Sequence, residues 1–336
     1  MITDVHVHHV PAGFLRFVQD AGPYGIQLDA PCGERVRLSA GRLSYDLNRS
    51  FFDIERLLAR MNEMRVEQAL LSIATPFVNF DLPASLGKEA AQLYNDEIAA
   101  IARIAPDRFQ GWAYLPMQDP EAAACELSRA VKSLQLIGGY LPSNVNASYL
   151  HADEFTPIFR MATDLDVPLL LHPSNPPARE RMANYELAVV GGYLFDTTLN
   201  IFHMVFGGLL DRYPGLRLCC THLGGYAPLL LRRMQRELDT NRELAGRLKR
   251  PLTHYLRALY YDTICFEPCY LRAAVESQAV DPTHLLPGSD TPFPLGEPDP
   301  VGFIERSCGS FAPQLTKAIL HDNAARFLNA KHGTDR

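Results

Sequence analysis

The chain has 336 residues, of which 47% are hydrophobic and 21% are charged, and its formal net charge is −6. This composition is that of a globular domain, and the length allows a large buried core. The sequence has no basic run that would bind nucleic acid or an anionic membrane, and no apolar stretch long enough to cross a bilayer. We therefore expect no nucleic-acid partner and no membrane span.

The N-terminus and the cysteines indicate a cytoplasmic protein. The chain starts with an apolar run that lacks the basic segment and cleavage pattern of a secretory signal. Its seven cysteines are an odd number and follow no zinc-finger spacing. Cys219 and Cys220 are adjacent, which fits a buried strand better than a disulfide. We expect reduced thiols and a cytoplasmic location.

Short apolar runs alternate along the chain with longer stretches of helical period. Eight of these runs are predicted to be strands: 2–8, 66–74, 109–116, 137–142, 167–172, 216–222, 259–266 and 284–290. Helices are predicted at 53–64, 86–105, 120–135, 154–165, 194–211, 226–247, 268–279 and 312–328. Strand followed by helix, eight times, predicts a distorted (β/α)8 TIM-type barrel, with 1–336 forming one metal-dependent domain.

Two features of the first strand and its surroundings qualify this prediction. A doubly wound open sheet is the alternative fold, but it would need a glycine-rich phosphate turn after the first strand, and "HHVPAGF" is not one. Residues 15–50 do not fit the strand–helix repeat and contain several glycines and prolines. We expect them to form a small insertion subdomain over the barrel mouth.

Polar side chains stand where several predicted strands end. His6 and His8 close the first strand, and residues two apart on a strand point the same way. His172 ends the fifth strand, His222 the sixth and Asp290 the eighth. In a (β/α)8 barrel the chemistry lies at the carboxyl ends of the strands, so these five side chains are expected to converge.

Four of the five fit a metal site. Imidazoles with one carboxylate suit Zn²⁺, the expected ion, with Mn²⁺ and Fe²⁺ as alternatives. His6, His8, His172 and Asp290 are the predicted ligands, and they leave a position for a water that the ion would activate. A second ion would need a bridging ligand at the end of the fourth strand. That strand ends "YLPSN", without Lys or Glu, so one ion is predicted.

The remaining residues of the site are assigned to chemistry and substrate. His222 is left over from the ligand set and is predicted to be the general acid/base, with a fifth ligand or a supporting partner as the alternative. Asp290 is also predicted to be a catalytic residue. Arg233 lies on the following predicted helix, and its planar guanidinium suits a substrate carboxylate, unless it is only a surface residue.

The sequence resembles the metal-dependent amidohydrolase superfamily, in the branch related to aminocarboxymuconate-semialdehyde decarboxylase. The matching stretches are "DVHVHHVP", "IATP", "LLLHP", "FDTTLNIFHMVFGGLLDRYPGLRLCCTHLGG", "GSDTPFPLGE" and "HDNAARFLN". The resemblance implies a distorted barrel with a zinc-type ion, a catalytic histidine at His222 and a homodimer. It also implies that Arg233 reaches a substrate carboxylate across the dimer interface and that Phe293 forms an aromatic wall of the pocket.

The chain departs from that branch at the substrate positions. A second substrate arginine expected in the insertion has no match, and Tyr45 stands nearest its place. Tyr185 stands where the branch has an indole, and Leu223 where it usually has a glycine. These departures affect the identity of the substrate and leave the metal chemistry unchanged.

Three functions are compatible with this reading. The first is a metal-dependent nonoxidative decarboxylase of a small unsaturated or aromatic carboxylic acid, in which His222 delivers a proton, directly or through bound water. The second keeps the mononuclear site but makes the chain a hydrolase or hydratase. The third is a noncatalytic barrel that binds a metal or ligand.

Overall fold

Eight of the described strands form one parallel sheet. The computed structural model describes residues 1–20, 26–29, 35–40, 43–309 and 312–329. The sheet has the order β1-β5-β6-β7-β10-β11-β12-β13, and all its pairings are parallel. The strands are β1 Thr3–His8, β5 Gln68–Ser72, β6 Phe109–Tyr114, β7 Gly138–Pro142, β10 Leu169–His172, β11 Leu218–Cys220, β12 Tyr260–Asp262 and β13 Leu285–Leu286. Each overlaps one of the eight predicted strands.

The two edge strands meet and close the sheet. The backbone N–H of Val5 donates to the Pro287 carbonyl over 2.9 Å, and that of His8 to the Thr291 carbonyl over 2.7 Å. In return the N–H of Asp290 donates to the His6 carbonyl over 2.9 Å. These bonds join β1 to the segment after β13, so the predicted TIM-type barrel is confirmed.

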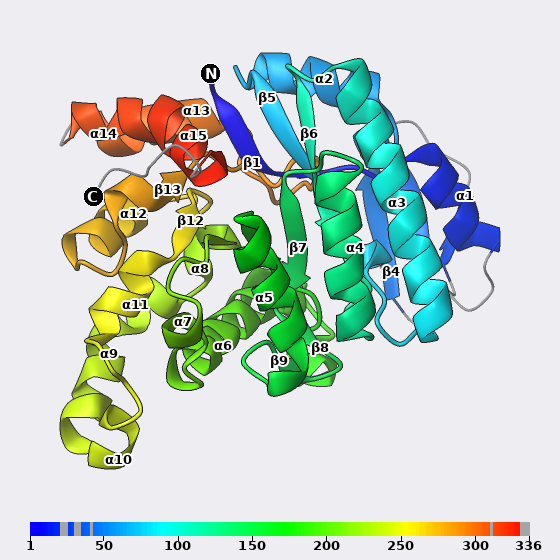
Figure 1. Ribbon diagram of the computed structural model, residues 1–336. Helices are drawn as coiled ribbons and strands as arrows, with labels where there is room; N and C mark the ends of the chain where they lie inside the picture. The colour runs from blue at the N-terminus through cyan, green and yellow to red at the C-terminus, as the bar shows by residue number, and fades with distance from the viewer. Residues whose placement is uncertain (21–25, 30–34, 41–42, 310–311, 330–336) are drawn as a thin grey trace.

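Helices surround the barrel, as Figure 1 shows. They are α1 Ala12–Asp20, α2 Ile54–Glu63, α3 Ala84–Ile104, α4 Pro120–Lys132, α5 Thr156–Leu165, α6 Tyr193–Phe206, α7 Leu209–Arg212, α8 Thr221–Gly224, α9 Ala227–Thr240, α10 Arg242–Ala245, α11 Leu252–Ala258, α12 Pro268–Glu276, α13 Pro300–Cys308, α14 Pro313–Lys317 and α15 Asn323–Leu328. Several begin at the predicted signals. Asp53 accepts from the backbone N–H groups of Glu55 and Arg56 at the start of α2, and Asp119 caps α4 ahead of its first-turn proline.

Several helical regions differ from the prediction. Helices α1, α11 and α13 were not predicted, because each is short and begins at or directly after a proline, which indicated a loop. The predicted helix 312–328 is divided into α14 and α15 by a π-helical turn at 318–322. The predicted helix 226–247 is likewise two helices, since Asn241 is extended and caps α10.

A second, smaller sheet lies between α1 and α2 in the sequence. It is antiparallel and consists of β2 Ile26–Leu28, β3 Arg35–Ala40 and β4 Leu43–Asn48. These strands fall within the predicted insertion 15–50, which also contains part of α1 and residues outside the described ranges. The division into barrel and insertion subdomain stays a prediction.

The strands of the barrel wall are covered on both faces. Both β5 and β7 are buried along their whole length, as expected for strands covered by helices. In the described residues no helix is both long and apolar enough to span a membrane. The six described cysteines are all free thiols.

Candidate metal centre and active site

Four of the predicted site residues meet at the carboxyl ends of the barrel strands. His6 and His8 lie on β1, His172 ends β10, and Asp290 follows β13. One ligand atom from each lies within 4.8 Å of the other three, and all four residues are buried. The imidazole rings of His6 and His8 are both about 5 Å from that of His172, with ring centroids 4.9 and 5.0 Å away. The structure therefore brings the predicted ligand set together.

The three imidazoles are held from behind, so that one nitrogen of each faces the centre. The Nδ1 atom of His6 lies 2.8 Å from Asp262 Oδ2, and a carboxylate can only accept, so this nitrogen carries the proton. Carbonyl oxygens play the same part for His8, at 2.9 Å from Ile73, and for His172, at 2.7 Å from Pro173. The free nitrogen of each ring is thereby Nε2, which is the usual arrangement of metal-binding histidines.

A divalent cation fits the atoms left at the centre. The Nε2 atom of His172 is buried and has no hydrogen-bond partner in the part of the chain described. Burial, and then the neighbouring histidines, hold the pKa of His172 well below its ordinary value, so this nitrogen offers a lone pair. An apolar ligand would leave this lone pair without a partner. Coordination to a metal ion removes that cost.

The charges around the centre also favour the binding of a cation. Burial would lower the pKa of His6, but the carboxylates of Asp290 and Asp262 outweigh burial and raise it to about 10. Burial would raise the pKa of Asp290, but His6 and hydrogen bonds from His222, His6 and His8 keep it well below its usual range. The buried carboxylate is thus stabilised by positive charge at the ligand positions. A proton on His6 supplies this charge in the metal-free chain, and a metal ion would replace it.

His222 lies beside the ligand cluster. Its Nε2 atom is 3.5 Å from Oδ2 of Asp290, whereas Oδ1 of Asp290 lies 2.9 Å from His8 Nε2 and 3.2 Å from His6 Nε2. The His222 side chain is 15% exposed, so it borders both the centre and the mouth. Its Nδ1 atom is buried without a hydrogen-bond partner among the described residues.

The backbone at His222 is unusual. His222 was expected at the end of a strand, but β11 ends at Cys220 and His222 has φ 54° and ψ 48°, the left-handed region. Leu223, Gly224 and Gly225 also have positive φ, so the chain makes a left-handed turn of four residues. Asp290 shares this feature, with φ 60°. Side chains other than glycine are costly there, and such residues concentrate at functional sites.

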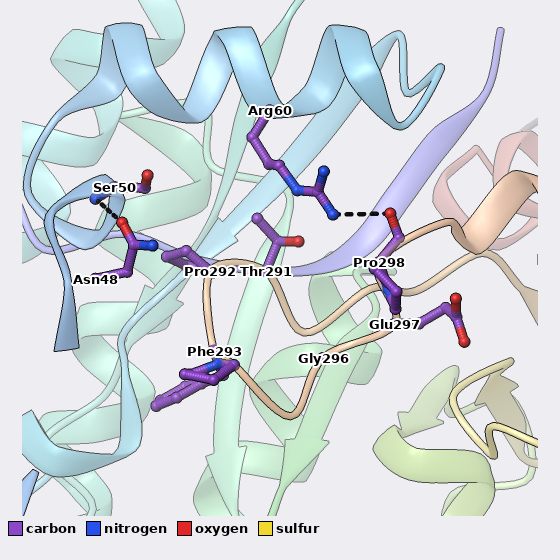
Figure 2. Close-up of a pocket in the computed structure, with 10 residues that line it drawn as sticks. Asn48, Ser50, Arg60, Thr291, Pro292, Phe293, Gly296, Glu297 and Pro298 are labelled. Atoms are coloured by element: carbon purple, nitrogen blue, oxygen red, sulfur yellow. Dashed lines mark hydrogen bonds between the residues drawn. The ribbon is translucent and has the colours of Figure 1, made fainter. Parts of the chain in front are cut away.

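Phe293 forms part of the wall next to the cluster. Its ring centroid lies 5.1 Å from that of His8 and 4.7 Å from that of Phe51. Figure 2 shows the cavity of about 210 Å³ that Phe293 borders, between the loop carrying Asp290 and Arg60 of α2. This cavity is lined by Asn48, Ser50, Arg60, Thr291, Pro292, Phe293, Pro294, Gly296, Glu297 and Pro298, and so by none of the four predicted ligands.

The other predicted substrate positions differ in their surroundings. Arg233 is exposed on α9, and its side chain makes no hydrogen bond or ion pair with the described residues. Tyr185 is 88% exposed. Leu223 is buried in the left-handed turn. Tyr45 belongs to β4, but its side chain lies outside the described residues.

Sequence reasoning missed the residues that support the ligands. Asp262 at the end of β12 holds His6, and the Tyr140 hydroxyl of β7 lies 3.2 Å from His172 Nδ1. Asp262 ends its strand, and that position was the available signal, whereas Tyr140 lies in the middle of β7 and had none. The sequence alone indicated no partner for either residue. His9, which directly follows β1, is buried, and burial lowers its pKa to about 4.

A closed barrel with an H-x-H pair on β1, a histidine on β10 and an aspartate after β13 defines a metal-dependent enzyme of the amidohydrolase type. The chain belongs to the amidohydrolase family, whose model matches residues 3–330. This confirms the resemblance seen in the sequence.

Curated relatives of the chain are decarboxylases of this superfamily. The chain is 28% identical to 2-amino-3-carboxymuconate-6-semialdehyde decarboxylase of Dictyostelium discoideum, over 97% of the chain and 90% of the relative. It is 34% identical to gamma-resorcylate decarboxylase of Polaromonas sp. (strain JS666), over 54% of the chain and 60% of that relative.

A solved structure shares the fold. It is dihydroxybenzoic acid decarboxylase from Polaromonas sp. JS666 with bound manganese and the inhibitor 2-nitroresorcinol. It superposes with a TM-score of 0.79 at 24% identity, covering 98% of this chain and 97% of the other. At this identity the likeness supports the barrel.

Proposed function

We propose that this chain is a metal-dependent nonoxidative decarboxylase of a small aromatic or unsaturated carboxylic acid. The observation that carries the proposal is the position of His222, which borders a complete four-residue metal site without belonging to it. The decarboxylase activity named for two sequence relatives supports the same reaction.

One divalent ion would be held by His6, His8, His172 and Asp290. When bound, it supplies a Lewis acid that polarises an oxygen of the substrate. Zn²⁺ suits three imidazoles and one carboxylate. Mn²⁺, present in the structure of the dihydroxybenzoic acid decarboxylase, and Fe²⁺ are the alternatives that metal analysis must separate.

The chain's own residues would move the proton. Protonated His222 donates from Nε2 to the carbon that bears the carboxylate, and this breaks the conjugation of the substrate. The bond between this carbon and the carboxylate then cleaves. CO₂ leaves, and the electron pair of the broken bond restores the ring or diene. Asp290, 3.5 Å from His222 Nε2, orients that imidazole and stabilises its charged form. The net reaction replaces CO₂ by a proton.

Arg233 would bind the substrate carboxylate from a second subunit of a homodimer. Arg233 is exposed on α9 and makes no hydrogen bond or ion pair with the described residues of its own chain, so its guanidinium is free to bind a group outside that chain. Exposed apolar side chains occur on the segment before α6, on α6 and on α9 itself, namely Tyr185, Leu187, Val190, Phe195 and Leu229. The Tyr226 N–H donates to Thr198 Oγ1 over 2.8 Å, which ties the start of α9 to α6.

The experiment is a screen of carboxylic acids with the metal-loaded protein in D₂O. We expect CO₂ release with at least one dihydroxybenzoate or amino-carboxymuconate-type acid, and a single deuterium on the carbon that carried the carboxylate. The His222→Asn protein is the control and should release CO₂ about 10²- to 10⁴-fold more slowly. Absence of CO₂ from every acid would contradict the proposal, and a stable product labelled from ¹⁸O water would favour the hydrolase or hydratase. The cytoplasmic location stays a prediction.

A further inference from the structure

Asp262 connects the metal site to the turn that carries His222. It ends β12, is fully buried, and lies behind His6 as seen from the ligand centre. Its Oδ2 atom lies 2.8 Å from His6 Nδ1. Its Oδ1 atom accepts from the backbone N–H of Leu223 over 3.0 Å and from that of Ile264 over 3.2 Å. The Asp262 carboxylate therefore uses one oxygen for His6 and the other for the turn that carries His222.

Each of these bonds fixes something that the chemistry needs. The bond to Nδ1 selects the His6 tautomer whose Nε2 lone pair faces the centre. The bond to the Leu223 N–H fixes the peptide that directly follows His222, in a turn where no regular helical acceptor exists. The left-handed conformation of His222 is unfavourable by itself, so an external acceptor is required to hold it.

The surrounding packing leaves Asp262 no room to move. Gly288 lies against it, and a Cβ atom at position 288 would come within 2.7 Å of Asp262 Cβ. Only a glycine at position 288 lets the segment after β13 approach β12 this closely. The Asp262 side chain is thereby confined between β12 and this segment, and its carboxylate can orient both His6 and the turn at Leu223.

We propose that Asp262 is a positioning residue that sets His6 for the metal and His222 for proton transfer at the same time. Its role for His222 rests on the proposed function, whereas its role for His6 and for the turn does not. Asp262 touches neither the ligand centre nor the mouth, so it acts through these two residues.

Asp262→Asn is the informative variant, because it keeps the size of the side chain and removes one acceptor. An amide has a single oxygen, so it accepts either from His6 Nδ1 or from the Leu223 N–H. Whichever of the two N–H donors the amide oxygen accepts from, the NH₂ group of the amide faces the other donor and cannot accept from it. A matched control is Glu126→Gln on α4, a buried carboxylate that accepts from Asn95 and Arg129 and contacts no site residue among those described.

The experiment measures two properties that need no substrate. Zn²⁺ and Mn²⁺ affinities are determined by competition with a chelator, and amide hydrogen exchange is followed in peptides covering 221–226. For D262N we expect metal binding weakened by about 10- to 100-fold, as for other outer-shell partners of metal ligands, or faster exchange at the turn, or both. E126Q should leave both at the wild-type level.

The third measurement is kcat at saturating metal, where D262N should lose activity even with the site filled. Wild-type metal affinity together with wild-type exchange at 221–226 would overturn the proposal. If D262N does not fold, Gly288→Ala, which displaces Asp262 without changing its charge, must show the same losses, and wild-type values there overturn it. If the wild-type protein proves to have no decarboxylase activity, the proposed function fails while metal binding and exchange still decide on Asp262.

Discussion

The floor of the mouth and its outer rim are built differently. At the floor, His6, His8, His172 and Asp290 are buried, and each of the three imidazoles has its Nδ1 tied to an acceptor. At the rim, Arg233 and several apolar side chains of α6, α9 and the segment before α6 are exposed. The helices α9 and α10 extend away from the barrel in Figure 1.

This difference separates two tasks. A metal site is precise only if its ligands are held by packing and hydrogen bonds, and one chain supplies all of these. Residues that recognise the substrate can take their final positions when the substrate or a second subunit binds. Changes at the floor should therefore abolish metal binding or chemistry, and changes at the rim should alter substrate binding.

The largest effect is expected from His172→Ala. This substitution removes one of three imidazoles and the lone pair that is buried without a partner. Metal content, measured by elemental analysis after gel filtration, should fall from about one ion per chain to near zero, and activity should fall to background. His203→Ala, which removes an exposed histidine on α6, is the control and should keep its metal. Full metal content in H172A would mean that the ligand set is wrong.

His222→Asn should separate metal binding from chemistry. Asparagine tolerates the left-handed conformation of residue 222, so the turn should persist. We expect unchanged metal content and a kcat lower by about 10²- to 10⁴-fold, the usual contribution of a general acid. Parallel loss of metal and activity would instead identify His222 as a fifth ligand.

Arg233→Met should change substrate binding at the rim. Loss of a charge-assisted hydrogen bond, about 1.5–3 kcal/mol, corresponds to a KM higher by roughly 10- to 150-fold, while metal content stays constant. Arg232→Met, at the neighbouring exposed arginine, is the matched control.

Mixed dimers then show from which subunit Arg233 acts. Dimers of R233M with H222N should regain activity if the arginine serves the partner's site, because one of the two sites is then intact. No recovery, with mixed dimers demonstrated by mass, would place the arginine in its own chain's site or outside the reaction.

The smallest effect is expected at the opposite end of the barrel, before β13. Asp281 caps the turn Pro282–His284 and pairs with Arg257. Burial raises the pKa of this carboxyl, but bonds from Thr283 and the Arg257 charge outweigh burial and lower it overall.

A lowered pKa means that the stabilisation is present above the carboxyl's ordinary pKa and is lost as the pH falls through the native value. Asparagine keeps the cap but removes the charge that pairs with Arg257, so Asp281→Asn should cost about 0.5 kcal/mol of unfolding free energy at pH 7 and progressively less in acid. Urea titrations at several pH values measure this difference, with kcat unchanged throughout. An equal cost at all pH values would show that the carboxylate charge is not the cause.

The sequence by itself determined the barrel and predicted the four side chains that the structure brings together at its mouth. Apolar runs of strand length, separated by helical periods, are local patterns, and the strand ends of a parallel barrel necessarily share one face. His6, His8, His172 and Asp290 could therefore be assigned together without knowledge of any contact. The boundaries of α11, α13 and α15 were not predictable, because short helices between prolines depend on packing more than on pattern.

Only the tertiary structure decided how those residues are held. The left-handed turn at His222, the carboxylate of Asp262 behind His6, and the open position of Arg233 all depend on neighbours distant in the sequence. Asp262 is 256 positions from His6, and no periodicity links them. Hydrophobic pattern fixes which face a side chain takes, but a hydrogen bond requires two atoms within about 3 Å, and this distance is set only when the barrel closes.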